Sequence, residues 1–146
     1  RPPVVLIVDD DEGHAFLVQD ILETAQIARQ ILHFRDGQAI LDFFYPTTSS
    51  PHAVPGETYV ILLDVRMPKV DGEQVLARLK SDPNLKNLPV IMLTTTDDAR
   101  EVERCHQLGC NVYIQKPIDY EKFAEAIKRL GAFMSLLLLP PMKAAH

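Results

Sequence analysis

The chain has 146 residues, of which 47% are hydrophobic and 24% charged; this suits one globular domain and leaves no room for a second of ordinary size. Its net charge of -5 argues against binding to nucleic acid or to an anionic membrane. No apolar run approaches the roughly 20 residues that span a bilayer, and Cys105 and Cys110 lack metal-binding spacing. We therefore expect a cytoplasmic protein with reduced thiols.

Short apolar runs bounded by Asp, Gly, Pro or Asn predict strands that are buried on both faces. These runs are Val4–Val8, Ile31–Phe34, Tyr59–Leu63, Val90–Leu93 and Val112–Ile114. A segment with helical character follows each of them. Strands that alternate with helices in this way predict an α/β fold, with a parallel sheet, right-handed crossovers and helices on both faces.

Apolar residues at helical spacing mark the faces that we expect to be buried. In the first helix they are Phe16, Leu17, Ile21 and Leu22. The second helix is short, about Gly37–Phe44, and the third carries Val75, Leu76 and Leu79. The fourth has a weaker stripe of Val102, Cys105, His106 and Leu108. The last has the clearest stripe: Tyr120, Phe123, Ala124, Ile127, Leu130, Phe133 and Met134.

Side chains that could bind a ligand or take part in a reaction lie just after the predicted strands. Asp9, Asp10 and Asp11 follow the first strand, and Asp64 follows the third. If the strand order is 2-1-3-4-5, these two strands are neighbours and their acids converge at the point where the order reverses. Clustered carboxylates repel one another unless a hard cation lies between them, and oxygen ligands point to Mg²⁺.

The fourth and fifth strands deliver complementary groups to the same edge. Thr94 closes the fourth strand, and Lys116 follows the fifth. A cation, an ammonium and a hydroxyl together suit a phosphoryl group. The chain has no GxxxxGK loop, which argues against ATP hydrolysis. Arg66 stands where DxD-type phosphohydrolases place a general acid, so an acyl phosphate on Asp64 would turn over slowly, as suits a signalling protein and not an enzyme.

The sequence resembles the response-regulator receiver domain from Val4 to about Met134. The resemblance rests on these motifs in combination: Asp9-Asp10, Asp64-Val65-Arg66-Met67-Pro68 running into Asp71-Gly72, Thr94, and Tyr113-Ile114-Gln115-Lys116-Pro117. It implies a flavodoxin-like, doubly wound, five-stranded parallel sheet in the order 2-1-3-4-5 with five helices.

The resemblance also implies a role for each site residue. Asp64 would be the phosphoacceptor, and Asp10 would bind Mg²⁺ directly. Asp9 would act through water, and the backbone carbonyl of Arg66 would be a further ligand. Thr94 and Tyr113 match the switch pair of the family. Lys116 would contact the phosphoryl group, with a cis bond to Pro117.

The loop Pro46–Gly56, the segment Ser81–Lys86 and the tail Phe133–Pro141 resemble more narrowly the stand-alone regulators paired with bacterial phytochrome kinases. This implies a sensor histidine kinase as partner, with a bacteriophytochrome as the specific candidate, and a homodimer. We assign residues 1–135 to the receiver domain and 136–146 to an apolar tail. The expected dimer contact is Phe133, Leu136, Leu137, Leu138 and Leu139; a tail that packs back on its own domain is the alternative.

Other polar residues have structural interpretations. Asp11, Asp36 and Asp71 each precede a helix and are predicted to cap it or to mark its entry. We expect His14, His33, His52 and His106 to be surface or packing residues. Three functional alternatives stay open: a receiver cut from a larger regulator or hybrid kinase, a Mg²⁺-dependent phosphatase of small molecules, and a degenerate receiver that only binds a partner.

Overall fold

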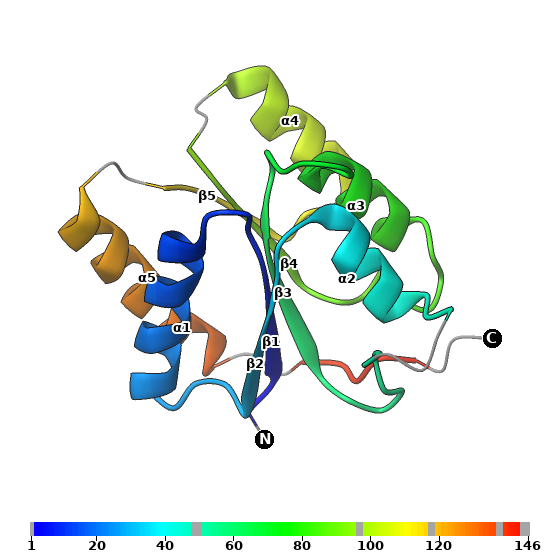
Figure 1. Ribbon diagram of the computed structural model, residues 1–146, viewed down its shortest axis with the longest axis horizontal. Coiled ribbons are helices and arrows are strands. Elements are labelled where there is room, and N and C mark those ends of the chain that lie inside the picture. Colours follow the sequence, from blue (N-terminus) through cyan, green and yellow to red (C-terminus); the bar gives the residue numbers. More distant parts are fainter. Residues whose placement is uncertain (1, 48–50, 96–97, 117–118, 137–138, 144–146) are drawn as a thin grey trace.

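The computed structural model describes residues 2–47, 51–95, 98–116, 119–136 and 139–143. The strands form one parallel sheet in the order β2-β1-β3-β4-β5 (Figure 1). Their bounds are β1 (Val4–Val8), β2 (Gln30–Phe34), β3 (Tyr59–Asp64), β4 (Val90–Thr94) and β5 (Val112–Gln115). The predicted strand order is confirmed, and each strand differs from its predicted bounds by at most about one residue at either end.

Helices cover both faces of the sheet. They are α1 (Glu12–Thr24), α2 (Gly37–Phe44), α3 (Gly72–Lys80), α4 (Ala99–Leu108) and α5 (Tyr120–Met134). Helices α1 and α5 lie on one face, and α2, α3 and α4 lie on the other (Figure 1). The flavodoxin-like arrangement predicted from the sequence is therefore confirmed. Within the described ranges, no helix is long and apolar enough to cross a membrane.

The sheet is buried between two apolar layers because alternate residues of each strand point to opposite faces. In β1, Val5 and Ile7 pack in the layer beneath α1 and α5. Val4, Leu6 and Val8 pack in the layer beneath α2, α3 and α4. A continuous apolar run is thus what this strand requires, and polar side chains are left to the strand ends.

Aspartates start the helices that follow β1, β2 and β3, as predicted. The side chain of Asp11 accepts a hydrogen bond from the His14 amide, Asp36 caps α2, and Asp71 forms a capping box at the start of α3. Gly72 has an additional reason to follow Asp71. A Cβ there would lie 2.1 Å from the Asp64 carbonyl oxygen, so only glycine lets α3 begin this close to the end of β3.

The predicted apolar stripes are wrong at several positions, because helix faces are set by what packs against them. Phe16, Tyr120 and Phe133 are exposed at 72%, 68% and 52%. In α4 the buried residues are Glu101 and Cys105, while His106 is exposed. The stripe predicted for this helix is thus right for Cys105 and wrong for His106, and the helix also buries a carboxylate that the stripe did not include.

The C-terminal segment crosses the amino end of the sheet (Figure 1). Leu139 packs against the α1/α5 layer, whereas Met142 is 5% exposed within the opposite layer. The Met142 amide donates to the Glu57 carbonyl at 2.7 Å, and its own carbonyl accepts from the Gly56 amide at 2.8 Å. Leu139 and Met142 thus pack on their own domain. Phe133 and Leu136 remain exposed, and Leu137 and Leu138 lie outside the described residues.

Candidate functional site

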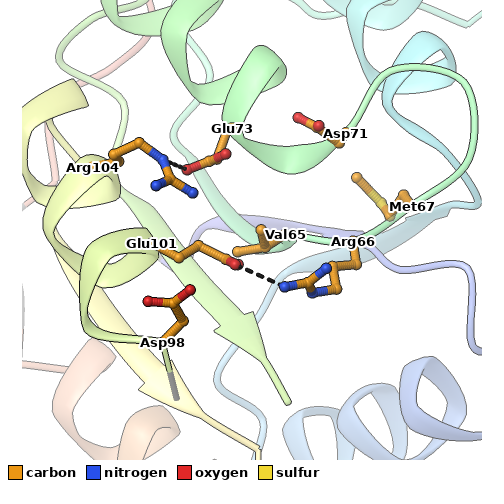
Figure 2. A pocket seen from close by; sticks show the side chains of 8 residues that line it. All are labelled: Val65, Arg66, Met67, Asp71, Glu73, Asp98, Glu101 and Arg104. Atoms are coloured by element: carbon orange, nitrogen blue, oxygen red, sulfur yellow. Dashed lines mark hydrogen bonds and ion pairs between the residues drawn. The ribbon is translucent and has the colours of Figure 1, made fainter. Parts of the chain in front are cut away.

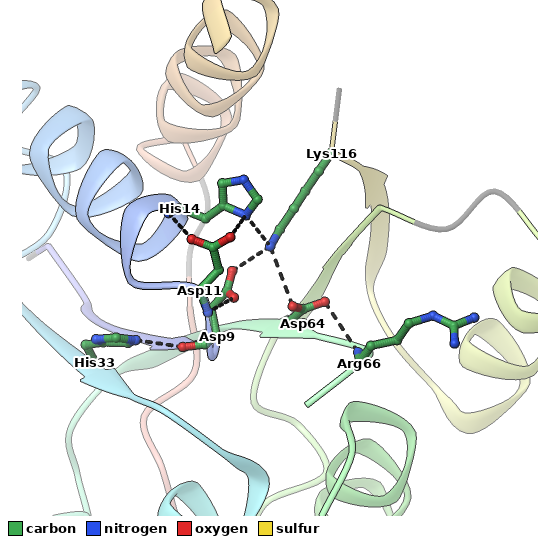
Figure 3. Close-up of polar contacts among 7 residues, drawn as sticks. All are labelled: Asp9, Asp11, His14, His33, Asp64, Arg66 and Lys116. Atoms are coloured by element: carbon green, nitrogen blue, oxygen red, sulfur yellow. Dashed lines mark hydrogen bonds and ion pairs between the residues drawn. The ribbon is translucent and has the colours of Figure 1, made fainter. Parts of the chain in front are cut away.

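Three charged side chains meet at the carboxyl end of the sheet (Figure 3). Asp9 follows β1, Asp64 ends β3 and Lys116 follows β5. The Lys116 Nζ atom lies 2.5 Å from Asp9 Oδ2 and 3.6 Å from Asp64 Oδ2. Lys116 is only 4% exposed, so two carboxylates and one ammonium share a buried site. The sequence prediction that these residues converge is confirmed.

The acids of this site suit a divalent cation. Asp9, Asp10 and Asp64 each offer a carboxylate oxygen, and these oxygens lie within 4.8 Å of one another. Burial raises the pKa of Asp64 to about 6; Lys116 opposes this rise, and the Asp9 charge adds to it. A carboxylate that is destabilised by burial and by a second carboxylate gains from a cation between them. The donor set is all oxygen, which fits Mg²⁺.

Thr94 and Tyr113 lie on β4 and β5 beside the charged cluster. Thr94 is fully buried at the end of β4, and its carbonyl accepts from the Lys116 amide at 2.6 Å. This bond holds the end of β5 against β4. The Tyr113 hydroxyl is buried, and the Thr94 side chain interacts with it. Burial, helped by the Glu101 charge, raises the pKa of Tyr113 to about 12, so this phenol stays neutral.

Two histidines contact this site, which the sequence did not indicate. The His14 Nδ1 atom lies 3.3 Å from Lys116 Nζ and 3.4 Å from Asp11 Oδ2. His33 Nε2 donates to the Asp9 carbonyl at 2.8 Å. His14 is 38% exposed and packs against Phe123, as expected for a surface or packing residue, but both histidines also make polar contacts at the site. For His33, its place between Leu32 and Phe34 in β2 was the one available signal, since strand interiors rarely keep a polar group without a partner.

The backbone of Arg66 contacts the site, whereas its side chain contacts α4. Its amide donates to Asp64 Oδ1 at 3.4 Å, whereas its guanidinium donates to Glu101 Oε2 at 3.0 Å (Figures 2 and 3). The side chain thus turns away from Asp64 toward the buried face of α4. Glu101 was missed in the sequence, because a glutamate in a polar helix carries no sign of burial. Pro117, with its expected cis bond, lies outside the described residues.

Comparison with known proteins defines the class of this chain. Residues 5–128 match the response regulator receiver domain. The chain therefore belongs to the response-regulator receiver family, as its motifs indicate. It is 32% identical to response regulator Rcp1 of Synechocystis over 137 residues, which cover 90% of this chain and 88% of Rcp1.

Solved structures show which receiver domains this chain resembles. A receiver domain from Rhodospirillum rubrum aligns with a TM-score of 0.89 at 38% identity, covering 97% of this chain and 99% of that one. The phosphorylated cyanobacterial phytochrome response regulator RcpA aligns at 0.87 with 28% identity, covering 96% and 99%. Rcp1 itself, in an Mn²⁺-bound form, aligns at 0.86 with 32% identity, covering 95% and 99%. This receiver is thus similar to response regulators of phytochromes.

Proposed function

We propose that this protein is a single-domain response regulator that accepts a phosphoryl group from a sensor histidine kinase onto Asp64. The observation that supports it most is the placement of Asp64. Its side chain is 12% exposed, and its carboxylate lies 3.6 Å from the Lys116 ammonium. One of its carboxylate oxygens lies within 4.8 Å of carboxylate oxygens of Asp9 and Asp10. An acceptor needs an accessible oxygen beside groups that neutralise phosphoryl charge, and this edge of the sheet supplies both.

The proposed transfer joins an Asp64 oxygen to phosphorus. The bond between phosphorus and the kinase histidine nitrogen breaks, and that nitrogen keeps the electron pair. Asp9, Asp10, Asp64 and the backbone carbonyl of Arg66 would hold Mg²⁺, which supplies positive charge to the phosphoryl oxygens. Lys116 neutralises a further oxygen. Arg66, whose guanidinium does not give up a proton near neutral pH, cannot serve as a general acid, so the acyl phosphate would persist as a signal.

The readout proposed for the phosphorylated state is a population shift. Thr94 would donate its hydroxyl hydrogen to the phosphoryl group, and Tyr113 would turn inward behind it. Thr94 ends β4, Tyr113 lies within β5, and Met92 pairs with Tyr113 across the two strands. The phosphoryl group shifts the equilibrium only by as much as it binds one state more tightly than the other.

The proposed partner is a histidine kinase of the bacterial phytochrome class. The similarity to Rcp1 and to the phytochrome response regulator RcpA supports this choice. The proposed location is the cytoplasm. Cys105 and Cys110 are both free thiols, which fits a reducing compartment.

The test is intact mass after incubation with acetyl phosphate. With Mg²⁺ the wild type should gain one phosphoryl group, and without Mg²⁺ it should gain little. Asp64→Asn should gain none, because the acceptor oxygen is replaced by an amide. The matched control is Asp42→Asn, which alters an exposed acid of α2 bonded to Gln38. An equal adduct on Asp64→Asn, or none on folded wild type, would contradict the proposal.

We further propose a homodimer contact at the end of α5. Phe133 and Leu136 are 52% and 82% exposed, and exposed apolar residues close together mark contact surfaces. Leu137 and Leu138, which lie outside the described residues, belong to the same proposed contact, whereas Leu139 packs on its own domain. Sedimentation of the wild type should show a dimer that Phe133→Glu with Leu136→Glu converts to monomer. An unchanged sedimentation coefficient in that variant would remove the contact.

A further inference from the structure

A polar pocket of about 410 Å³ lies between the loop after β3 and helix α4 (Figure 2). Two arginines and several acids line it, and each arginine is paired with one glutamate. Arg66 donates to Glu101 at 3.0 Å, and Arg104 donates to Glu73 at 2.9 Å. The two pairs are chemically alike, but only the Arg66–Glu101 pair includes a residue close in sequence to Asp64, the proposed phosphoacceptor at the end of β3.

Glu101 is in an unusual environment for a glutamate. It is 4% exposed, and its Oε1 atom is buried without a hydrogen-bond partner among the described residues. Its Oε2 atom is bonded to Arg66. The Arg104 charge also acts on Glu101, but only Arg66 donates a hydrogen bond to it among the described residues. A buried carboxylate that loses such a donor is costly to leave unpaired. The position of α4 therefore depends on where the Arg66 guanidinium is.

Arg66 has a choice of partner. Its backbone amide is held 3.4 Å from Asp64 Oδ1, while its side chain is 67% exposed and paired with Glu101. A phosphoryl group on Asp64 would replace the single carboxylate charge by about 1.5 to 2 negative charges and would place three acceptor oxygens beside that backbone. Arginine binds phosphoryl oxygens bidentately and more strongly than it binds one carboxylate oxygen.

We propose that Arg66 is a second switch residue: it leaves Glu101 for the phosphoryl group when Asp64 is phosphorylated, and the unpaired Glu101 then displaces α4. This inference rests on the proposed function. In the unphosphorylated protein the Arg66–Glu101 pair holds α4 against the loop after β3. In the phosphorylated protein Glu101 must reach water or a new donor, so the first turns of α4 move outward. A partner that pairs with Glu101 would in turn favour phosphorylation, since coupling is reciprocal.

A double-mutant cycle tests the proposal. The variants are Glu101→Gln, Arg66→Gln and the two combined, and the rate of phosphorylation by acetyl phosphate with Mg²⁺ is measured by intact mass. Glu101→Gln frees Arg66 and should raise the rate about threefold, the size expected for a partly exposed ion pair. In the Arg66→Gln background the same change should have no effect. Glu73→Gln, which breaks the matched pair, should leave the rate unchanged.

Hydrogen exchange of residues 99–108 gives a second readout that does not depend on reaction rate. In the wild type, exchange should rise on phosphorylation. In Arg66→Gln, which alters an exposed side chain, exchange should be raised before phosphorylation and should not rise further. Glu73→Gln should respond as the wild type does.

The outcomes separate the two proposals. If wild type forms no adduct, the proposed function fails. Two results would overturn only the second switch in a protein that does form the adduct. One is a Glu101→Gln effect on the phosphorylation rate that is equal with and without Arg66. The other is hydrogen exchange of residues 99–108 that is the same in wild type and Arg66→Gln.

Discussion

At the carboxyl end of the sheet, Lys116 lies buried between the carboxylates of Asp9 and Asp64, whereas at the amino end Met142 packs into an apolar layer and pairs its backbone with residues 56 and 57. The first end keeps charges out of water and holds an acid whose pKa burial raises to about 6. The second end satisfies its polar groups locally and buries apolar surface. Packing at the amino end of the sheet thus stabilises the fold, whereas the buried charges at the carboxyl end, where the candidate site lies, destabilise it.

The largest effect is expected from Lys116→Met. This change removes the only buried cation that the described residues place between Asp9 and Asp64, and breaking a buried charge pair costs about 3 to 5 kcal/mol. Urea unfolding at pH 7 in EDTA measures the loss. The control Lys128→Met alters an exposed lysine of α5 and should stay within about 0.5 kcal/mol of wild type. A loss below about 1 kcal/mol for Lys116→Met would mean that the two carboxylates do not need the ammonium.

Asp64→Asn should have the opposite sign. The folded protein raises the pKa of Asp64 from 3.8 to about 6, so the acid binds its proton more tightly when folded, and stability falls as pH rises through this range. The shift corresponds to about 3 kcal/mol lost by pH 7. Without divalent cations, Asp64→Asn should therefore be more stable than wild type at pH 7, and the difference should shrink toward pH 4.

Unfolding of the two proteins in EDTA at several pH values measures this difference. Mg²⁺ should then stabilise the wild type more than the variant, because a cation that binds the folded state adds to its stability. A variant that is less stable than wild type at pH 7 in EDTA would show that Asp64 is not an electrostatic burden in the fold.

At the amino end, Met142→Ala should lower the free energy of unfolding by about 2 kcal/mol, the low end for a buried methionine, because the terminal segment can relax. Leu136→Ala is the matched control in the same tail. Leu136 is 82% exposed, so its truncation should cost no more than about 0.5 kcal/mol at protein concentrations where no dimer forms. Equal losses for the two variants would indicate that the tail is not docked on the sheet.

Much of the fold could be predicted from the sequence because its signals are local. The apolar run of β1 is buried on both faces, and Asp11 and Asp71 cap helices, as expected for residues with those neighbours. The convergence of Asp9, Asp64 and Lys116 followed from strand order alone, since side chains at the carboxyl ends of parallel strands share one edge.

The remaining features depend on contacts between distant segments. Glu101 is buried because Arg66, 35 residues earlier, supplies its partner. Met142 is buried because the chain returns beneath the sheet, which no pattern within residues 136–146 predicts. His14 reaches Lys116 from more than 100 residues away, and helical periodicity does not specify which turn faces the site. Phe16 is exposed because neighbouring residues of α1 already fill the side of the helix that faces the sheet.

The most direct test of the central claim is to locate the phosphoryl group on the chain. After reaction with acetyl phosphate and Mg²⁺, borohydride reduces an aspartyl phosphate to homoserine, and peptide mass spectrometry identifies the converted residue. The account predicts conversion at Asp64 alone, with Asp9 and Asp10 unchanged in the same sample. Conversion at Asp9 or Asp10, or a phosphoryl group that borohydride does not release, would contradict it.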